Sequence, residues 1–282
     1  MKPGVHGFLG PNGAGKTTTI NMLVGAISIT KGKAKIKGKK AGSIEARRLI
    51  GFLPQDPSFE EKMTGEAYLT YMGQMSGLKK KYCRKRVQEL LFQLDLWDSR
   101  NRKIKTYSGG MKQKIGLALV LLHKPDLLIL DEPTANLDPI GREQIINTIK
   151  TISNDLSIFV SSHILSEIEQ MCDTVTIINK GEIVVSDTIQ NVKDLFRGNL
   201  IIINSNINSE ILETIQSLPF IQRAWIDSND KKIHIITTDF EQANKSLPAL
   251  IIQNKGTLQE FSHPELSLQE IFMKIIEREE DA

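Results

Sequence analysis

Short apolar segments alternate with longer segments of helical periodicity over the first 190 residues. Residues 4–9 read as a strand, and residues 16–25 as the helix that follows it. Residues 126–130 and 156–160 are short, continuous apolar runs, as expected of strands buried on both faces of a sheet. The alternation predicts an α/β fold with a mainly parallel sheet.

Two segments show the two-residue period of a strand. From Lys33 to Lys39 every second residue is a lysine, with Ala34, Ile36 and Gly38 between them, which predicts one half-buried strand over 33–40. Lysines there could attract phosphate, but they more often solvate a sheet face. Residues 174–178 and 182–186, joined through Asn179-Lys180-Gly181, predict a hairpin.

A helical subdomain is predicted near residues 56–107, with helices around 64–75 and 82–94. The start of the second helix carries a basic cluster. It consists of Lys79, Lys80, Lys81, Arg84, Lys85 and Arg86. The cluster could touch lipid headgroups or a partner, but such a charge run is usually a solvated face.

The composition changes after residues 196–198, and a second domain is predicted over 198–282. Its expected order is strand 200–204, helix 210–217, strands 222–227 and 232–237, helix 240–250, strand 257–261 and a last helix 268–277. The order βαββαβ plus a helix suits a small ferredoxin-like α+β domain. His234 and His263 have no partners at metal-ligand spacing, so both are predicted to be structural or surface residues.

Composition narrows the function classes. The chain of 282 residues is 40% apolar and 24% charged, as in an ordinary globular protein. A net charge of +3 is too small to argue for a nucleic-acid partner. Cys83 and Cys172 form no metal-ligand pattern, which favours a reducing compartment. The beginning does not resemble a signal peptide, and no apolar run approaches the ~18 residues of a spanning helix. Any membrane role is therefore expected to be peripheral.

The first motif with chemistry fits the pattern G-x-x-x-x-G-K-[ST] between a predicted strand and a predicted helix. Its residues are Gly10, Pro11, Asn12, Gly13, Ala14, Gly15, Lys16 and Thr17, followed by Thr18. Backbone N–H groups must approach a triphosphate closely, so glycines line such a loop. Lys16 would place its ammonium between the outer phosphates, and the Thr17 hydroxyl would bind Mg²⁺.

Two acids end the apolar run at residues 127–132. Asp131 would hold a water of the Mg²⁺ site, and Glu132 could act as the general base that polarises the attacking water. A further motif, Ser108-Gly109-Gly110-Met111, precedes a helix that runs to about residue 122. Ser108 is a natural N-cap, and the bare helix end is a possible anion site.

Together these motifs resemble the ABC (ATP-binding cassette) ATPase family across about the first 190 residues. In its terms 10–17 matches Walker A, 127–132 matches Walker B and 108–111 matches the signature motif. Gln55 matches the Q-loop glutamine, Asp138 in Ala135-Asn136-Leu137-Asp138 the D-loop, and His163 in Ser161-Ser162-His163 the switch histidine.

The resemblance implies a mechanism, two cofactors and two kinds of partner. Two identical or different subunits would sandwich two ATP molecules head to tail, each site joining Walker A of one subunit to Ser108 and Gly110 of the other. Gln55 would sense Mg²⁺ and the attacking water and report to a membrane permease. His163 would hold the γ-phosphate and position Glu132, since a neutral imidazole both donates and accepts. The protein would lie on the cytoplasmic side of the cell membrane, bound through the permease.

Two departures from the family pattern stand out. Met111 replaces the usual glutamine, with little loss expected, because the serine hydroxyl and the glycine backbone capture phosphate. The residues around Met111 and the segment 263–272 resemble those of the branch that serves ABC-2 type exporters. Only nine residues precede Gly10, none a substitute for the family's adenine-stacking aromatic, so we expect the first strands and this adenine platform to be missing.

Two alternatives to an exporter ATPase follow from the same motifs. A soluble ABC protein of the chromosome-maintenance or translation-factor kind would need a long coiled coil or a second Walker A, and the sequence has neither. A shortened or inactive subunit acting as a structural partner is the better rival. Glu132 and His163 argue against it, while the short segment ahead of Gly10 argues for it.

Overall fold

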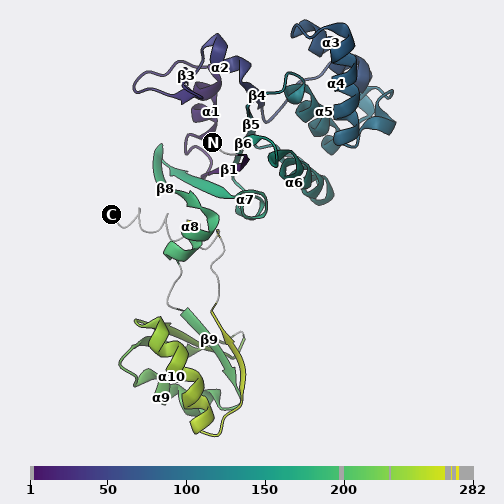
Figure 1. Cartoon of the computed structure of the whole chain (residues 1–282). Helices are drawn as coiled ribbons and strands as arrows, with labels where there is room; N and C mark the ends of the chain where they lie inside the picture. Colours follow the sequence, from purple (N-terminus) through teal and green to yellow (C-terminus); the bar gives the residue numbers. More distant parts are fainter. Residues whose placement is uncertain (1–2, 197–199, 229, 264–267, 269–270, 273–282) are drawn as a thin grey trace. The chain divides into compact units, whose positions relative to one another are not determined.

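The computed structural model describes residues 3–196, 200–228, 230–263, 268 and 271–272 (Figure 1). The chain divides into two compact units, Met1–Ile189 and Gln190–Ala282. The first unit carries every motif with predicted chemistry. Each unit has its own buried core, so the two are described separately.

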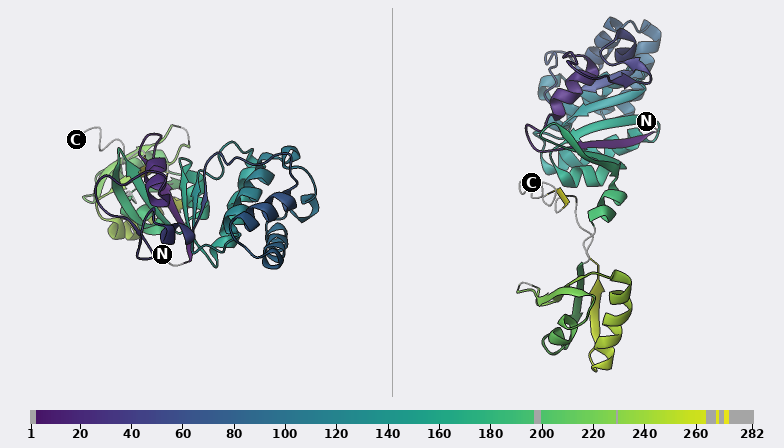
Figure 2. Two further views of the ribbon diagram at one scale, coloured as in Figure 1. Left: turned by 90° about the horizontal axis from the view of Figure 1, so that it is seen from above. Right: turned by 90° about the vertical axis from the view of Figure 1, so that its left-hand side faces the viewer.

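A six-stranded sheet forms the centre of the first unit. Its strands are β1 (Gly4–Leu9), β4 (Ile50–Leu53), β5 (Leu127–Asp131), β6 (Ser157–Ser162), β7 (Thr174–Asn179) and β8 (Glu182–Thr188). Their order is β4-β5-β6-β1-β7-β8, and every neighbouring pair is parallel except β7–β8. Figure 2 shows the purple β1 among the teal strands of this sheet. The predicted α/β fold with a mainly parallel sheet is confirmed.

Helices follow the ends of the strands. They are α1 (Lys16–Val24), α2 (Ile44–Arg48), α6 (Pro139–Ser153) and α7 (Leu165–Met171). The chain then continues as α8 (Ile189–Phe196), which begins at the boundary between the two units. The start of α6 has a clear local cause: the Asp138 carboxylate accepts from the backbone N–H of Gly141 at 2.8 Å, and Pro139 occupies the first helical position, where no N–H is needed. Ile145, Ile146 and Ile149 give α6 a buried apolar face.

A helical group lies beside the sheet (Figure 1). It consists of α3 (Gly65–Met75), α4 (Lys80–Gln93) and α5 (Gly109–Leu121), with short 3₁₀ turns at Trp97–Ser99 and Ile104–Thr106. Thr64 begins α3 by accepting from the N–H of Ala67. Leu69, Leu90 and Ile115 place an apolar residue of each helix in the buried core. The helices expected over 64–75 and 82–94 therefore form.

The single strand predicted over residues 33–40 is wrong. The segment is a tight hairpin of β2 (Lys35–Ile36) and β3 (Lys39–Lys40). Lys37 and Gly38 form its turn with φ of 46° and 81°, the backbone conformation that two-residue hairpin loops require. The alternation of lysines continues through the turn, because Lys37 and Gly38 occupy a polar and an apolar position of the pattern. The sequence therefore predicts one long strand in place of two short ones.

The second unit contains β9 (Leu200–Ser205), α9 (Asn208–Gln216), β10 (Ile221–Ile226), β11 (Ile233–Thr237), α10 (Phe240–Gln253) and β12 (Leu258–Ser262). The sheet is antiparallel with the order β10-β11-β9-β12, the arrangement of a ferredoxin-like domain. Ile201, Ile235 and Leu247 are among its buried core residues. The helix predicted over 268–277 falls mostly outside the described residues.

The histidines of this unit have ordinary partners. His234 lies 3.0 Å from the Asp230 carboxylate, and the ring of His263 packs against Phe240 at 4.2 Å between centroids. Among the residues that the structure describes, no group of three or more His, Cys, Asp or Glu side chains could hold a metal ion.

Candidate functional site

The glycine-rich loop joins β1 to α1. Gly13 and Gly15 have φ of 80° and 104°, a region that side chains disfavour, so the loop needs glycine at both positions. Gly15 is also the residue before α1, and no side chain caps that helix. The first N–H groups of α1 therefore remain open, and with the helix dipole they form an anion site.

Lys16 lies beneath this loop. Its side chain is only 6% exposed, and its Nζ donates to the carbonyl oxygens of Gly10 at 2.8 Å and Pro11 at 3.1 Å. Nζ also lies 3.9 Å from Glu132 Oε1. Burial lowers the pKa of Lys16 below its ordinary value, and the charges of Glu132 and Asp131 oppose this effect.

The two acids at the end of β5 are fixed by a serine of the neighbouring strand. The Ser161 hydroxyl donates to Asp131 Oδ1 at 2.5 Å and accepts from the backbone N–H of Glu132 at 3.0 Å. Glu132 has a φ of 47°, the left-handed conformation that is uncommon outside glycine. Such backbone strain is typical of functional sites and persists only where surrounding contacts hold it.

Two predicted residues contact the carboxylate of a third. Glu132 Oε2 lies 3.0 Å from Nδ1 of His163 and accepts a hydrogen bond from Nε2 of Gln55 at 3.3 Å. Gln55 follows β4, Glu132 follows β5 and His163 follows β6, so the carboxyl ends of adjacent parallel strands bring them together.

These side chains share a hollow of about 340 Å³ with the glycine-rich loop. It is lined by Asn12, Gly13, Gly15, Lys16, Thr17, Thr18, Gln55, Glu132 and His163. Backbone donors, one ammonium, a carboxylate and an imidazole therefore face the same space. That arrangement can hold a polyphosphate and activate water beside it.

The signature residues and Asp138 do not line this hollow. Ser108 caps α5 by accepting from the N–H of Met111 at 3.3 Å, and Asp138 caps α6. Gly109 packs close to Leu137, because a side-chain carbon added there would lie 3.0 Å from that leucine. Within one chain, the bare start of α5 and the phosphate loop are thus not parts of one site.

The donors fit Mg²⁺ that is delivered with a nucleotide. Thr17 lines the hollow. The buried Asp131 ends β5 and directly precedes Glu132, which lines the hollow as well. Mg²⁺ is usually held by one or two carboxylates together with phosphates and water, so a cage built wholly from protein is not required.

Sequence reasoning missed three polar residues behind the site. Ser161 binds both acids, and Thr134 donates to the buried Glu167 at 2.5 Å. Ser161 could have been noticed, because it is a polar residue near the end of an otherwise apolar buried strand. Thr134 and Glu167 carry no such signal, because their contact joins a loop to a helix more than 30 residues later.

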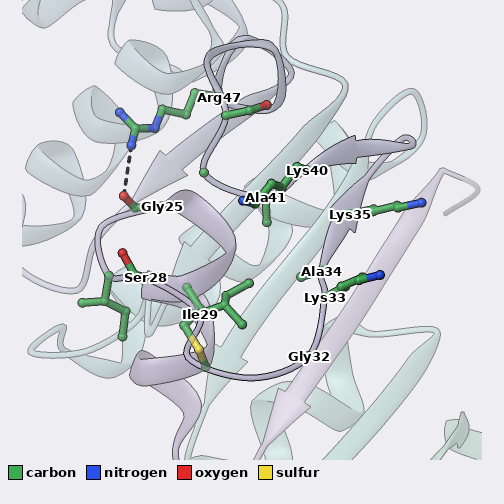
Figure 3. Close-up of a pocket in the computed structure, with 14 residues that line it drawn as sticks. Gly25, Ser28, Ile29, Gly32, Lys33, Ala34, Lys35, Lys40, Ala41 and Arg47 are labelled. Carbon is green, nitrogen blue, oxygen red and sulfur yellow. Dashed lines mark hydrogen bonds between the residues drawn. The ribbon is translucent and has the colours of Figure 1, made fainter.

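A second hollow, of about 750 Å³, lies between the end of α1 and the β2–β3 hairpin (Figure 3). Apolar residues such as Met22 and Ile29 line it together with Lys33 and Lys35, whose side chains extend to one side. Arg47 donates to the carbonyl of Gly25 at 3.0 Å. None of the predicted site residues lines this hollow.

Comparison with known proteins identifies two segments. Residues 2–135 match the family described as "ABC transporter", and residues 188–276 match "ATP-binding protein DrrA1-3-like, C-terminal domain". A solved structure titled "Structure of ATP binding subunit of ABC transporter" is 28% identical, with a TM-score of 0.60, and covers 69% of this chain and 82% of its own.

Curated relatives match along nearly the whole chain. The uncharacterized ABC transporter ATP-binding protein YxlF of Bacillus subtilis is 37% identical over 95% of this chain and 89% of its own length. The linearmycin resistance ATP-binding protein LnrL of the same organism is 33% identical (96% and 89%). The bacitracin transport ATP-binding protein BcrA of Bacillus licheniformis is 34% identical (96% and 88%). No helix within the described residues has the length and apolar character needed to cross a membrane.

Proposed function

The chain belongs to the ATP-binding proteins of ABC transporters, and from this premise we propose that its ATPase activity drives an exporter of the ABC-2 type. Subunits of this family bind ATP and work with permease subunits. The exporter assignment is supported by the DrrA-like match over residues 188–276 and by the relatives named for bacitracin transport and linearmycin resistance. We place the ATPase part at residues 1–190 and an accessory domain at 198–282, in keeping with the two compact units.

Phosphate binding is assigned to the loop of residues 10–18. The open N–H groups at the start of α1 would hold the β- and γ-phosphates. Lys16 would exchange the carbonyls of Gly10 and Pro11 for phosphate oxygens. Because its ammonium is already buried and oriented, little side-chain freedom would be lost on binding.

Activation of water is assigned to Glu132. Its carboxylate faces the hollow and would accept the proton of the attacking water. His163 would donate from one ring nitrogen to Glu132 or to the γ-phosphate and so keep the two groups in line. Gln55 would hold the same carboxylate, or the water, through its amide.

Mg²⁺, when it arrives with ATP, would neutralise charge on the β- and γ-phosphates. Thr17 would contribute its hydroxyl to that ion, and Asp131 and Gln55 would contact it directly or through water. Ser161 keeps Asp131 oriented, since its hydroxyl donates to one carboxylate oxygen and leaves the other available.

Completion of the site is assigned to a second subunit. Ser108 and Gly110 lie outside the hollow of their own chain, and the N-terminus of α5 carries no side chain beyond the Ser108 cap that would block an anion. A second copy or a different ATP-binding subunit would present this helix end to the γ-phosphate. The dimer would lie on the cytoplasmic face of the membrane, bound to the permease.

The observation that carries the proposal is the convergence of Gln55, Glu132 and His163 beside Lys16. Phosphate release from Mg²⁺-ATP by the full chain, with Lys16→Ala as control, tests it. Hydrolysis that depends on Lys16 and increases when the permease is co-purified supports the assignment. A parental rate no higher than that of Lys16→Ala, with or without the permease, would favour the structural-partner alternative.

A further inference from the structure

Glu167 is a buried carboxylate that the proposed reaction does not use. It lies in α7, four residues after His163, and is 4% exposed. It does not line the hollow of the proposed ATP site. A carboxylate removed from water needs compensating partners, so its contacts indicate what it holds together.

The carboxylate of Glu167 binds three segments. Its Oε2 accepts from the Thr134 hydroxyl at 2.5 Å and from the Ser162 hydroxyl at 3.3 Å. Its Oε1 lies 3.6 Å from Nε of Arg142, close enough for an ion pair but without a hydrogen bond. Thr134 and Ser162 are each 2% exposed, so the two hydrogen bonds are shielded from water.

Each partner lies next to a residue of the proposed site. Thr134 is two residues beyond Glu132, and Ser162 directly precedes His163. Arg142 lies in the first turns of α6, whose N-cap is Asp138. One carboxylate thereby ties the segment after Glu132 to the segment that presents His163.

We propose that Glu167 is a positioning residue for ATP hydrolysis, which fixes the His163 loop against the Thr134–Asp138 segment. The inference rests on the proposed function. Glu132 stands in a left-handed conformation that its surroundings must maintain, and its contact with His163 depends on where the two loops lie. The Thr134–Glu167–Ser162 bridge is a buried side-chain connection between these loops, in addition to the contacts of Ser161.

Removal of one hydroxyl tests the bridge with minimal change of shape. Thr134→Val replaces the donor by a methyl group of similar size, while Thr134→Ser retains the donor. We expect Thr134→Val to lower kcat by on the order of 10- to 10²-fold, because small misplacements of catalytic groups have effects of that size. ATP affinity should stay close to parental, since neither Thr134 nor Glu167 faces the phosphates. Thr134→Ser should retain most of the parental kcat.

Thr237→Val is the matched control. Thr237 is also fully buried, and its hydroxyl donates to the carbonyl of Phe220 at 2.7 Å in the second unit. The same substitution there removes a buried hydroxyl without touching the site. It should lower the thermal midpoint of the second unit and leave kcat unchanged.

The full chain is used, with Glu132→Gln measured in parallel to test the proposed function separately. Loss of kcat in Thr134→Val at unchanged ATP affinity, with recovery in Thr134→Ser, supports the positioning role. The role is refuted if Thr134→Val keeps the parental kcat, or if kcat and ATP affinity fall together with the folded fraction. If the parental chain hydrolyses ATP and Glu132→Gln does not, the proposed function stands even where the Glu167 inference fails.

Discussion

Glu132 and His163 lie 3.0 Å apart, Oε2 to Nδ1, because they follow neighbouring parallel strands that end at the same level. The register pairs Asp131 of β5 with Ser161 of β6. Glu132 lies one residue beyond this pair, and His163 lies two residues beyond it. Parallel strands with this register deliver a carboxylate and an imidazole to one point without any local sequence relationship between them.

Glu132→Gln should separate ATP binding from ATP hydrolysis. The amide keeps the shape of the side chain but cannot accept the proton of water, so we expect kcat to fall by ~10²–10⁴. ATP should still bind, because the phosphate loop is unchanged. Phosphate release and equilibrium ATP binding measure the two effects. Near-parental turnover in Glu132→Gln would remove this residue from the role of general base.

Ser108→Arg should abolish hydrolysis without weakening ATP binding to a single chain. The substitution blocks the start of α5, which lies outside the hollow of its own chain. Mixing Ser108→Arg with Lys16→Ala should restore at most the activity of the one site built from two intact halves. The mixture, and each variant alone, can be compared by phosphate release.

Ser43→Arg provides the control for that experiment. Ser43 caps α2 as Ser108 caps α5, by accepting from the N–H of Ala46 at 3.2 Å. Both substitutions remove a serine cap, but only the change at Ser108 should stop hydrolysis. Full activity from Ser108→Arg, or from an isolated monomer of the parental chain, would contradict a site shared between subunits.

The 282-residue chain should discriminate poorly between ATP and GTP. The described residues that line the hollow include no Phe, Tyr or Trp side chain on which a base could stack. Stacking on an aromatic ring tolerates any base, so its absence weakens the binding of ATP and GTP alike, by about 1–3 kcal/mol or roughly 5–150-fold in affinity. We expect the affinities for ATP and GTP to differ by less than about fivefold, measured by competition, with Lys16→Ala weakening both equally. Tight binding of ATP with rejection of GTP would show that residues outside this hollow recognise the base.

The stability of the first unit should fall as the solution becomes mildly acidic. His6 in β1 is half-buried between the hydroxyls of Thr174 and Thr176, and burial lowers its pKa below the ordinary value of 6.5. Below that pH the unfolded chain takes up a proton that the folded chain refuses, so the free energy of unfolding decreases. The loss begins near pH 6.5 and levels off once the pH is below the folded pKa.

Urea unfolding at pH 7.5 and at pH 5.5 measures this effect. In a Trp225→Phe background the fluorescence comes from Trp97 alone, which lies in the first unit. Adding His6→Gln should reduce the difference between the two pH values, because glutamine does not titrate. An equal pH difference with and without His6 would show that other groups cause the acid sensitivity.

Much of the fold was predictable because its elements have local causes. The strand Gly4–Leu9 and the helices after Lys16 and Thr64 follow from apolar periodicity, glycines and caps. The hairpin at Lys35–Lys40 was not predicted, because positive φ at Lys37 leaves no mark in a two-residue lysine pattern. An α/β core and a ferredoxin-like succession of elements could be inferred, whereas the order β4-β5-β6-β1-β7-β8 of the first sheet depends on pairings distant in sequence.

The candidate site also contains residues that the sequence predicts and residues that only the folded structure reveals. Motifs predict Gln55, Glu132 and His163, and in the structure Gln55 and His163 both contact the Glu132 carboxylate. Ser161 and Glu167 were not found, because their contacts arise only when strand ends and a later helix are brought together. Motifs identify groups that meet a ligand, while groups that orient those residues depend on tertiary packing.

The two serines that end β6 constrain how this protein can change in length. The Ser161 hydroxyl binds the Asp131 carboxylate and the backbone N–H of Glu132, whereas the Ser162 hydroxyl binds Glu167, so consecutive positions serve opposite sides of one strand. Insertion or deletion of one residue within Ser157–Ser162 would move each hydroxyl to the opposite face of the strand and break both sets of contacts at once. Length variation in evolution should therefore be excluded from β6 and tolerated at the β2–β3 turn, where Gly38 faces open space.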